Sequence, residues 1–297
     1  IGIGATRLSS RYPVPAGGHL SRPSETEPTM PTLRANDADL FYTDSGQGET
    51  VLLMHGLGSS SSAWQPQVAA LAPHYRVLAL DARGSGKSRD LKHPAGPFSP
   101  RQFSEDARAL LDSLGAAPAH VVGLSMGGIV AFQLAVDHPR IFRTMTIVNS
   151  GPELVGRTLQ QRAMIALRLT ISRLYGPRGM ARMLAPKLFP KPEHESLREK
   201  FRTEMALNDK AAYIATQRAL VGFSVLDRIG EIDCPALIVA SDQDYTLFEA
   251  KEAYARRMKR AEVVVVKDAR HALPMEEPEK FNPILLDFLG RHAARRP

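Results

Sequence analysis

Short, continuous apolar runs recur along the chain between residues 51 and 266. A strand buried on both faces of a sheet is apolar at every position, whereas a half-buried strand alternates apolar and polar residues. Residues 40–44 alternate and end at a turn, so they predict a half-buried strand. The continuous runs predict fully buried strands at 51–54, 77–80, 121–124, 145–148, 236–240 and 263–266.

The stretches between these runs carry helical patterns. Ser99-Pro100-Arg101-Gln102 has the residues of a helix start, with an N-cap serine, a proline at the first helical position and a glutamine that can close a capping box. Helices are also expected over residues 126–137 and 247–259. Strands that alternate with helices are typical of a mostly parallel sheet covered on both faces, so the sequence predicts an α/β fold.

Residues 152–226 break this alternation. We interpret them as a helical cap inserted over one edge of the sheet, with residues 30–151 and 227–297 forming the core. The cap has no strand-like run and shows helical patterns at 156–175, 177–188, 193–207 and 209–223.

Residues 1–29 form an N-terminal lead of different composition. They are rich in Ser, Pro, Gly and Thr and lack the apolar middle region of a secretory signal. The first methionine is Met30, so one interpretation is that the lead comes from the expression vector or from translation upstream of the native start. We expect part of this lead to be loosely held.

The overall composition is that of an ordinary globular protein. Of 297 residues, 43% are apolar and 23% charged, which excludes a disordered or fibrous chain. The net charge is +7, but we expect its densest cluster, at 256–260, to be the solvated face of a surface helix and not a nucleic-acid site. No apolar run reaches the roughly 18 residues of a membrane helix. The single cysteine, Cys234, fits a reducing compartment, so we expect a cytoplasmic protein with no membrane partner.

The strongest chemical signal is Gly123-Leu124-Ser125-Met126-Gly127, which ends a buried strand and starts a helix. Small neighbours let the chain turn sharply enough to expose the hydroxyl of a nucleophilic serine. A second signal, His55-Gly56-Leu57-Gly58, follows the first buried strand. A hydrolytic serine needs backbone N–H donors for the developing oxyanion, and Leu57 and Met126 are the candidates. We expect His55 to support this loop and not to act as the base.

Together with residues 81–88, these motifs resemble in order and spacing the α/β-hydrolase fold, and more narrowly its capped esterase, lactonase and C–C hydrolase branch. The resemblance covers about residues 38–290 and makes Asp81 and Arg83 structural. Gly86-Lys87-Ser88 imitates the end of a phosphate-binding loop, but Asp81 stands where that loop needs its first glycine. We therefore expect no nucleotide site.

The resemblance also implies an acid and a base in the chain order Ser, Asp or Glu, His. In Ser241-Asp242-Gln243-Asp244 a serine replaces the family's usual glycine; by the family's spacing Asp244 is the acid, with Asp242 as its rival. The base is then His271, in a segment where relatives commonly carry Gly-His. Here Arg270 precedes the histidine, and a cation beside the imidazole would tend to lower its pKa.

The mechanism implied is that of a serine hydrolase. His271 takes the proton of Ser125, Asp244 holds the imidazole, and water releases an acyl-enzyme. A serine at this position argues against haloalkane dehalogenase and epoxide hydrolase chemistry, and no metal-ligand spacing or cofactor is implied. We expect a carboxylic ester hydrolase for small to medium esters or lactones. The alternatives are a C–C hydrolase of ring-fission diketones and a non-catalytic binding protein, and the oligomeric state stays open.

The composition of the predicted cap favours the ester hypothesis. Between residues 156 and 215 its aromatic residues are few, namely Tyr175, Phe189, Phe201 and, if it faces inward, Tyr213. Such a cap offers few stacking surfaces and few cations for a rigid, charged diketone, but suits a flexible acyl chain of about two to eight carbons. Part of its aliphatic set is expected to line the acyl pocket: Met164, Ile165, Leu167, Leu169, Met180, Met183, Leu184 and Leu188.

Overall fold

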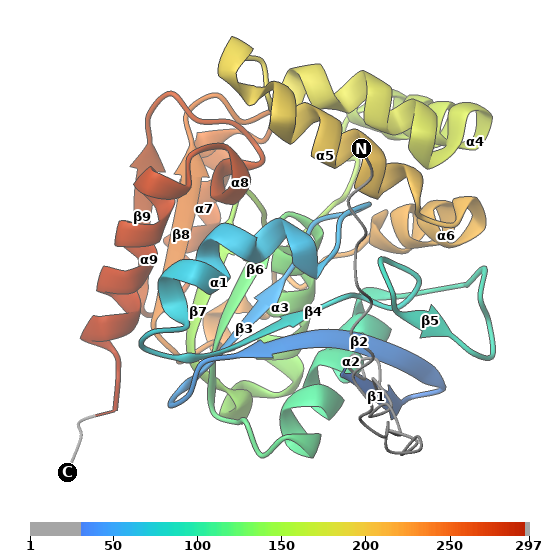
Figure 1. Ribbon diagram of the computed structural model, residues 1–297. Coiled ribbons are helices and arrows are strands. Elements are labelled where there is room, and N and C mark those ends of the chain that lie inside the picture. The colour runs from blue at the N-terminus through green and yellow to red at the C-terminus, as the bar shows by residue number, and fades with distance from the viewer. Residues whose placement is uncertain (1–30, 295–297) are drawn as a thin grey trace, which may run out of the picture.

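A twisted, mostly parallel sheet with helices on both faces forms the centre of the molecule (Figure 1). The computed structural model describes residues 31–294, so the predictions for the lead at 1–29 lie outside the described residues. The strand order is β1-β2-β4-β3-β6-β7-β8-β9, with β5 paired to β2. β2 runs antiparallel to its neighbours, whereas β4 through β9 run parallel along this order. The predicted α/β class is confirmed.

Every strand predicted from an apolar run is present, but the prediction of full burial is wrong for β9, which lies at the edge of the sheet and is only partly buried at five of its six positions. β3 and β6 are buried at every position, which explains why their sequences do not alternate. Two short strands were not predicted, β1 and β5, because neither has an apolar run. The strands are β1 Thr32–Ala35, β2 Ala38–Ser45, β3 Thr50–Met54, β4 Arg76–Leu80, β5 Arg89–Asp90, β6 Ala119–Leu124, β7 Phe142–Val148, β8 Ala236–Ser241 and β9 Ala261–Val266.

The helices of the core are α1 Gln65–Leu71, α2 Pro100–Ser113, α3 Met126–Asp137, α7 Phe248–Ala255, α8 Leu273–Glu276 and α9 Pro278–Arg291. α2 starts as predicted, with the Ser99 side chain accepting the Gln102 N–H at 3.1 Å. α7 ends before the basic cluster that was expected to lie on it. In that cluster Lys259 pairs with Asp233 at the surface. Of the helices in residues 31–294, none is both long and apolar enough to cross a membrane.

Two apolar layers hold the helices to the sheet, one on each face. α2, α3 and α7 pack on one face through a cluster that includes Phe103, Phe132 and Tyr254. α1 and α9 cover the other face, together with Trp64 and Phe281. The carboxyl ends of the parallel strands meet at one edge of the sheet, and in open α/β sheets this is the edge at which ligands bind.

Three helices lie together over this carboxyl edge: α4 Leu159–Leu188, α5 Glu195–Ala206 and α6 Lys210–Leu220 (Figure 1). We call them the helical insertion. The two helices expected at 156–175 and 177–188 are joined in α4, which breaks at Gly176, where the backbone is left-handed (φ +62°). At the base of the insertion, Glu153 bridges Ser224 in antiparallel fashion, close to where the insertion was expected to begin and end.

Candidate active site

Ser125 occupies the turn between β6 and α3 in a backbone conformation that is rare outside glycine (φ +53°, ψ −112°). Two neighbouring glycines make this turn possible. A Cβ on Gly123 would lie 2.4 Å from the Gly127 carbonyl carbon, and one on Gly127 would lie 2.1 Å from the Met54 oxygen. The glycines of the motif are therefore required because β6, α3 and β3 approach one another without room for side chains. This close packing turns the Ser125 side chain toward a cavity.

Asp244 and His271 meet on the loops that follow β8 and β9. The His271 Nδ1 lies 2.8 Å from the Asp244 Oδ1, and the Asp244 side chain is fully buried. Burial by itself would raise the pKa of Asp244, but the hydrogen bond from His271 and the nearby charges of His271 and Lys251 outweigh it and lower that pKa. The carboxylate is thus ionised near neutral pH. It holds the proton on Nδ1 and leaves Nε2 free to act as a base.

The rival acid, Asp242, lies elsewhere on the same turn. It is exposed, and its Oδ1 accepts the Ala269 backbone N–H at 3.3 Å. The geometry therefore pairs His271 with Asp244 and leaves Asp242 to support the turn. Arg270, expected to face the imidazole, instead directs its guanidinium to the buried Glu276 at 3.3 Å.

Asn149, just after β7, ties the two loops together. Its backbone is left-handed (φ +47°), and its Nδ2 donates to the Ser241 Oγ at 2.8 Å and to the Arg270 carbonyl at 3.0 Å. Its Oδ1 accepts the Ser241 N–H at 2.9 Å. Ser241, which replaces the family's glycine, thus supplies a hydroxyl to this bridge. The sequence analysis missed Asn149, whose only signal is its position directly after a buried strand.

Lys251, on α7, is a buried cation behind the acid. Its Nζ lies 2.8 Å from the Asp244 Oδ2 and 2.6 Å from the Thr246 Oγ1, and Thr246 also donates to the carboxylate. The Lys251 side chain is only 2% exposed. Sequence reasoning missed it because a lysine in a helix is normally solvated. Both oxygens of Asp244 are consequently paired.

Tyr245 places its hydroxyl beside the imidazole of His271. The hydroxyl lies 2.7 Å from the His271 Nε2, and the two rings stack with their centroids 4.1 Å apart. Ser125 and Arg168 are further hydrogen-bond partners of the same hydroxyl. Although the Tyr245 residue as a whole is exposed, desolvation of its hydroxyl raises the pKa of Tyr245 to about 12, so the hydroxyl keeps its proton and donates it to Nε2. Sequence reasoning missed Tyr245, although it directly follows Asp244.

The two candidate oxyanion donors lie beside Ser125. Met126 is the first residue of α3, so its N–H has no acceptor within the helix. Leu57 lines the cavity, and a Cβ on Gly56 would lie 3.5 Å from the Ser125 Cβ, so this loop passes next to the serine. His55 supports the loop in the manner expected: its Nε2 accepts the Ala82 N–H at 3.0 Å, and its Nδ1 donates to the Gly56 carbonyl at 2.8 Å. Burial lowers the pKa of His55, which keeps it neutral.

A cavity of about 370 Å³ separates these groups from the helical insertion. Its aromatic lining is sparse, as expected, and consists of Phe201 and Tyr245. Its cations are also few, but two of them, Arg168 and Lys187, line it at positions that the residue pattern did not single out. Arg168 shares a helix face with Met164, four residues earlier, and the residue pattern alone does not tell which face turns inward. The insertion's aliphatic lining includes Met164, Leu167, Ile171, Met180, Met183 and Leu184.

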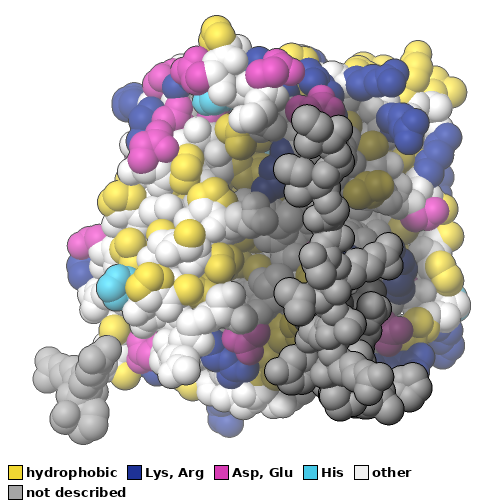
Figure 2. Space-filling view, in the orientation of Figure 1, with side chains coloured by type: hydrophobic (Ala, Val, Ile, Leu, Met, Phe, Trp, Pro, Cys, Tyr) yellow, Lys and Arg dark blue, Asp and Glu magenta, His cyan; other side chains and the backbone are white. Residues whose placement is uncertain are grey.

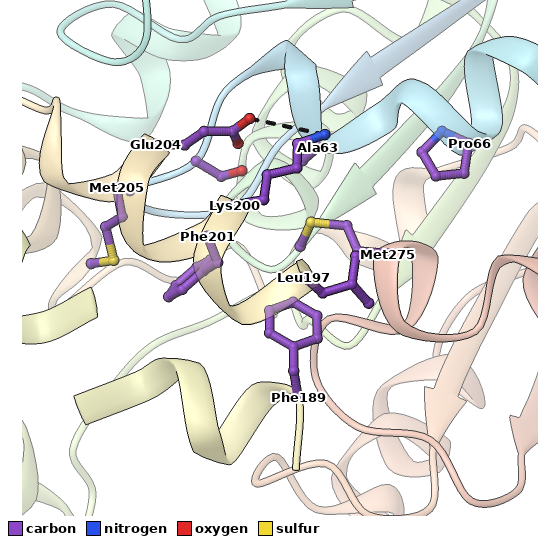
Figure 3. Close-up of a pocket in the computed structure, with 11 residues that line it drawn as sticks. Ala63, Pro66, Phe189, Leu197, Lys200, Phe201, Glu204, Met205 and Met275 are labelled. Atoms are coloured by element: carbon purple, nitrogen blue, oxygen red, sulfur yellow. Dashed lines mark ion pairs between the residues drawn. The ribbon is translucent and has the colours of Figure 1, made fainter. Parts of the chain in front are cut away.

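A smaller cavity of about 40 Å³ lies next to the first, where α5 meets the core (Figure 3). It is large enough for a water molecule and too small for an organic substrate. At its rim Lys200 and Glu204 of α5 form an ion pair at 3.9 Å. Glu204 also accepts from the Ser62 hydroxyl at 2.8 Å, and Lys200 donates to Gln65 at 2.6 Å. This region therefore anchors α5 to the core.

Comparison with known proteins agrees with this architecture. The profile of the alpha/beta hydrolase family matches residues 51–284. A protein of Azorhizobium caulinodans, named as a RutD-type carbamate hydrolase, is 30% identical over 88% of this chain and 98% of its own length. The structure of the enol-lactonase from Burkholderia xenovorans LB400 superposes with a TM-score of 0.80 at 27% identity, covering 88% of this chain and all of that one. A malate-bound thermophilic esterase from Thermogutta terrifontis gives 0.78 at 25% identity, covering 86% and 95% of the two chains.

Proposed function

The chain belongs to the alpha/beta hydrolase family, and from this premise we propose that it is a serine hydrolase that cleaves small to medium carboxylic esters or lactones. One observation carries the proposal. The Asp244–His271 pair, joined at 2.8 Å, opens onto the same cavity as Ser125, which stands on its strained turn. A serine, a histidine and a buried carboxylate in this relation are the groups that acyl transfer requires.

In the proposed mechanism the Ser125 oxygen attacks the substrate carbonyl carbon while the His271 Nε2 takes its proton. The carbonyl oxygen becomes an oxyanion that accepts hydrogen bonds from the N–H groups of Leu57 and Met126. His271 then returns the proton to the leaving alcohol as its bond to carbon breaks. Water, deprotonated by the same Nε2, attacks the acyl-enzyme and releases the acid, which restores the Ser125 hydroxyl.

Tyr245 must move within this cycle. Its hydroxyl contacts both Ser125 and the His271 Nε2, which is where the leaving-group oxygen of a bound ester would lie. We infer that substrate binding displaces this hydroxyl from Nε2. One neutral hydrogen bond of this kind is worth about 1 kcal/mol, so the displacement is a modest cost.

The volume of the cavity is consistent with a small to medium substrate. About 370 Å³ falls in the lower part of the usual range for small-molecule sites, and its insertion side is mostly aliphatic. A flexible acyl chain gains about 0.8 kcal/mol for each buried methylene, until the cavity is full. Among the similar proteins, the names include an esterase and an enol-lactonase, in line with this substrate class.

The second candidate is a C–C bond hydrolase that acts on ring-fission diketones. Arg168 and Lys187 favour it more than the residue pattern did, since a charged diketone would find cations in the cavity. The two candidates are separated by assaying the same preparation for loss of ring-fission-product absorbance and for release of nitrophenol. Faster cleavage of the diketone than of every ester would replace the first proposal with the second.

The test of the first candidate is a series of 4-nitrophenyl esters from C2 to C8, assayed with the wild type and with Ser125→Ala. We expect the wild type to hydrolyse the short esters and to lose activity toward long chains. Ser125→Ala should lower kcat by about 10⁴–10⁶-fold and leave the fold intact, because it removes one hydroxyl from a turn. A variant that kept a tenth of the activity would show that Ser125 is not the nucleophile.

A further inference from the structure

All charged side chains of α4 are positive. Between Leu159 and Leu188 it has no aspartate or glutamate and carries six cations: Arg162, Arg168, Arg173, Arg178, Arg182 and Lys187. In the space-filling view, Lys and Arg side chains gather with apolar ones at the upper right, the end of the molecule that α4 and α6 occupy in Figure 1 (Figure 2). Positive charge along one wall of a cleft raises the local concentration of anions.

In the part of the chain that the structure describes, these cations have no acidic partners, although Arg162 donates to the Gly156 carbonyl at 2.9 Å. Within residues 31–294, no carboxylate forms an ion pair with any cation of α4. Two of them, Arg168 and Lys187, line the cavity of about 370 Å³ beside Ser125, and both residues are exposed. A guanidinium with free donors facing a mostly aliphatic cavity is arranged to bind a carboxylate, which it can hold with two parallel hydrogen bonds.

Arg168 also lies close to the reacting groups. It contacts the Tyr245 hydroxyl, and that hydroxyl contacts Ser125 and the His271 Nε2. Arg168 and Ser125 line the same cavity of about 370 Å³, so an anion bound to Arg168 is separated from the serine by a spacer short enough to fit within that cavity. A substrate that fits has its carboxylate a few bonds from the carbonyl that is attacked.

We propose that the natural substrate is an ester or lactone that carries a free carboxylate, and that Arg168 binds this carboxylate with Lys187 as a second cation. The inference rests on the proposed hydrolysis at Ser125 and adds the chemical class of the substrate. The apolar part of the cavity then holds the short chain between the two functional groups.

The test compares pairs of esters in which one carboxyl group is either free, and so negatively charged, or esterified and neutral. The anionic members are monoethyl succinate, glutarate and adipate, with the carboxylate on the acyl portion, and butyryl glycolate, with the carboxylate on the alcohol portion. The neutral partners are the corresponding ethyl diesters and butyryl glycolate methyl ester. We expect the wild type to prefer at least one anionic member by about tenfold or more in kcat/KM, and 0.5 M NaCl to reduce the preference by screening.

Substitutions then show which residues cause the preference for anionic esters. Arg168→Gln should reduce the anionic-to-neutral ratio about tenfold, mostly through KM, while Arg168→Lys keeps most of the ratio and Lys187→Gln lowers it two- to threefold. The matched control is Arg140→Gln, which also removes one exposed cation but lies just before β7, at the opposite end of that strand from the cavity. The control should leave the ratio unchanged.

Binding without turnover separates failure of this inference from failure of the proposed function. Monomethyl adipate and dimethyl adipate are titrated into Ser125→Ala by calorimetry, with and without Arg168→Gln. Tighter binding of the monoanion, lost in Arg168→Gln, supports the carboxylate site even if no ester is hydrolysed. Hydrolysis of neutral esters with no preference for any anion, and equal ratios in Arg168→Gln and Arg140→Gln, would overturn it while the proposed function stands.

Discussion

The charges at the carboxyl edge of the sheet and the charges on α4 are arranged in opposite ways. At the carboxyl edge of the sheet, Asp244 has both oxygens paired, one with His271 and one with Lys251, and the acid and the lysine are buried. On α4 the cations are exposed and form no ion pair with a carboxylate of the described chain. Paired, buried charges fix a geometry, whereas unpaired charges are free to bind a ligand.

α5 shows that the insertion as a whole is not loosely held. It alternates acids and bases, and Arg198 pairs with Glu195 while Arg202 pairs with Glu199. Its polar contacts with Ser62 and Gln65 hold it to the core. The insertion thus has one helix that anchors it and one that faces the substrate. We expect substitutions at the edge to affect the rate for every substrate, and substitutions on α4 to change which substrate is preferred.

Among substitutions at the carboxyl edge of the sheet, Asp244→Asn is expected to have the largest effect on kcat after Ser125→Ala. The amide favours the wrong imidazole tautomer, so kcat should fall about 10³–10⁴-fold for neutral and anionic esters alike. Asp242→Asn is the matched control and should cost far less, because Asp242 supports the turn through Ala269. Steady-state kinetics of the two variants check this, and the reverse order would assign the acid to Asp242.

Lys251→Met comes next, with an expected loss of about 10- to 100-fold in kcat/KM, since it removes the cation that holds one oxygen of Asp244. Without this opposing positive charge, Asp244 favours the protonated imidazole more strongly. The acid limb of the pH–activity profile should therefore move to higher pH. An acid limb that stayed in place would show that Lys251 serves packing alone.

For Lys251→Met we also predict how the loss of thermal stability depends on pH. The pKa of Asp244 is lowered in the folded protein, so its ionised form contributes stability above its ordinary pKa, and this is lost as pH falls through the folded value. Lys251→Met should thus unfold at a lower temperature than the wild type at pH 7. The difference should narrow on acidification, because a protonated Asp244 no longer needs a cation. Thermal melts across pH check this.

Tyr245→Phe should have a smaller effect of opposite sign. Removing the hydroxyl that occupies the His271 Nε2 spares the substrate the displacement, so kcat/KM for small neutral esters should rise about fivefold. The rate of inactivation by an organophosphonate should rise with it. A tenfold loss in both measurements would instead assign the hydroxyl an active part in the reaction.

The smallest effect on activity is expected for substitution of an aliphatic residue of α4 that lines the cavity. Met183→Ala enlarges the cavity, so activity on a C8 ester relative to a C4 ester should rise about two- to threefold. Leu174→Ala is the control, since Leu174 is exposed on the same helix and does not line the cavity. Equal chain-length profiles for the two variants would mean that the acyl chain binds elsewhere.

The sheet could be predicted from the sequence because its central strands are buried on both faces, which makes residues 51–54 and 121–124 apolar throughout. Ser125 and Asp244 could be named because each follows a buried strand, and His271 because it follows the apolar run of β9; the resemblance assigns an order to the three. The carboxyl ends of parallel strands meet at one edge, so a chain position there also predicts a position in space.

The surroundings of these residues could not be predicted in the same way. Lys251 and Arg168 lie on helices, and a helical pattern does not reveal whether a charged side chain turns to solvent or inward. Asn149 acts on Ser241, 92 residues later in the chain, through contacts that the chain order does not contain. Tyr245 directly follows Asp244, but its contact with His271 depends on the direction in which its side chain leaves the loop.

The base of the insertion has a consequence for how this chain can be altered. Leu154 donates to the Phe223 carbonyl at 2.8 Å, and Gly222 donates back to the Leu154 carbonyl at 2.9 Å, so the chain leaves and re-enters the core at neighbouring points. The segment between them is a module that the chain enters and leaves through one short ladder, and side chains of α5 fasten it to the core at Ser62 and Gln65. A module of another length or composition can be exchanged at that ladder without moving β7 or β8. Libraries that replace the entire module, grafted between Glu153 and Ser224, would therefore sample new substrate preferences on an unchanged catalytic edge.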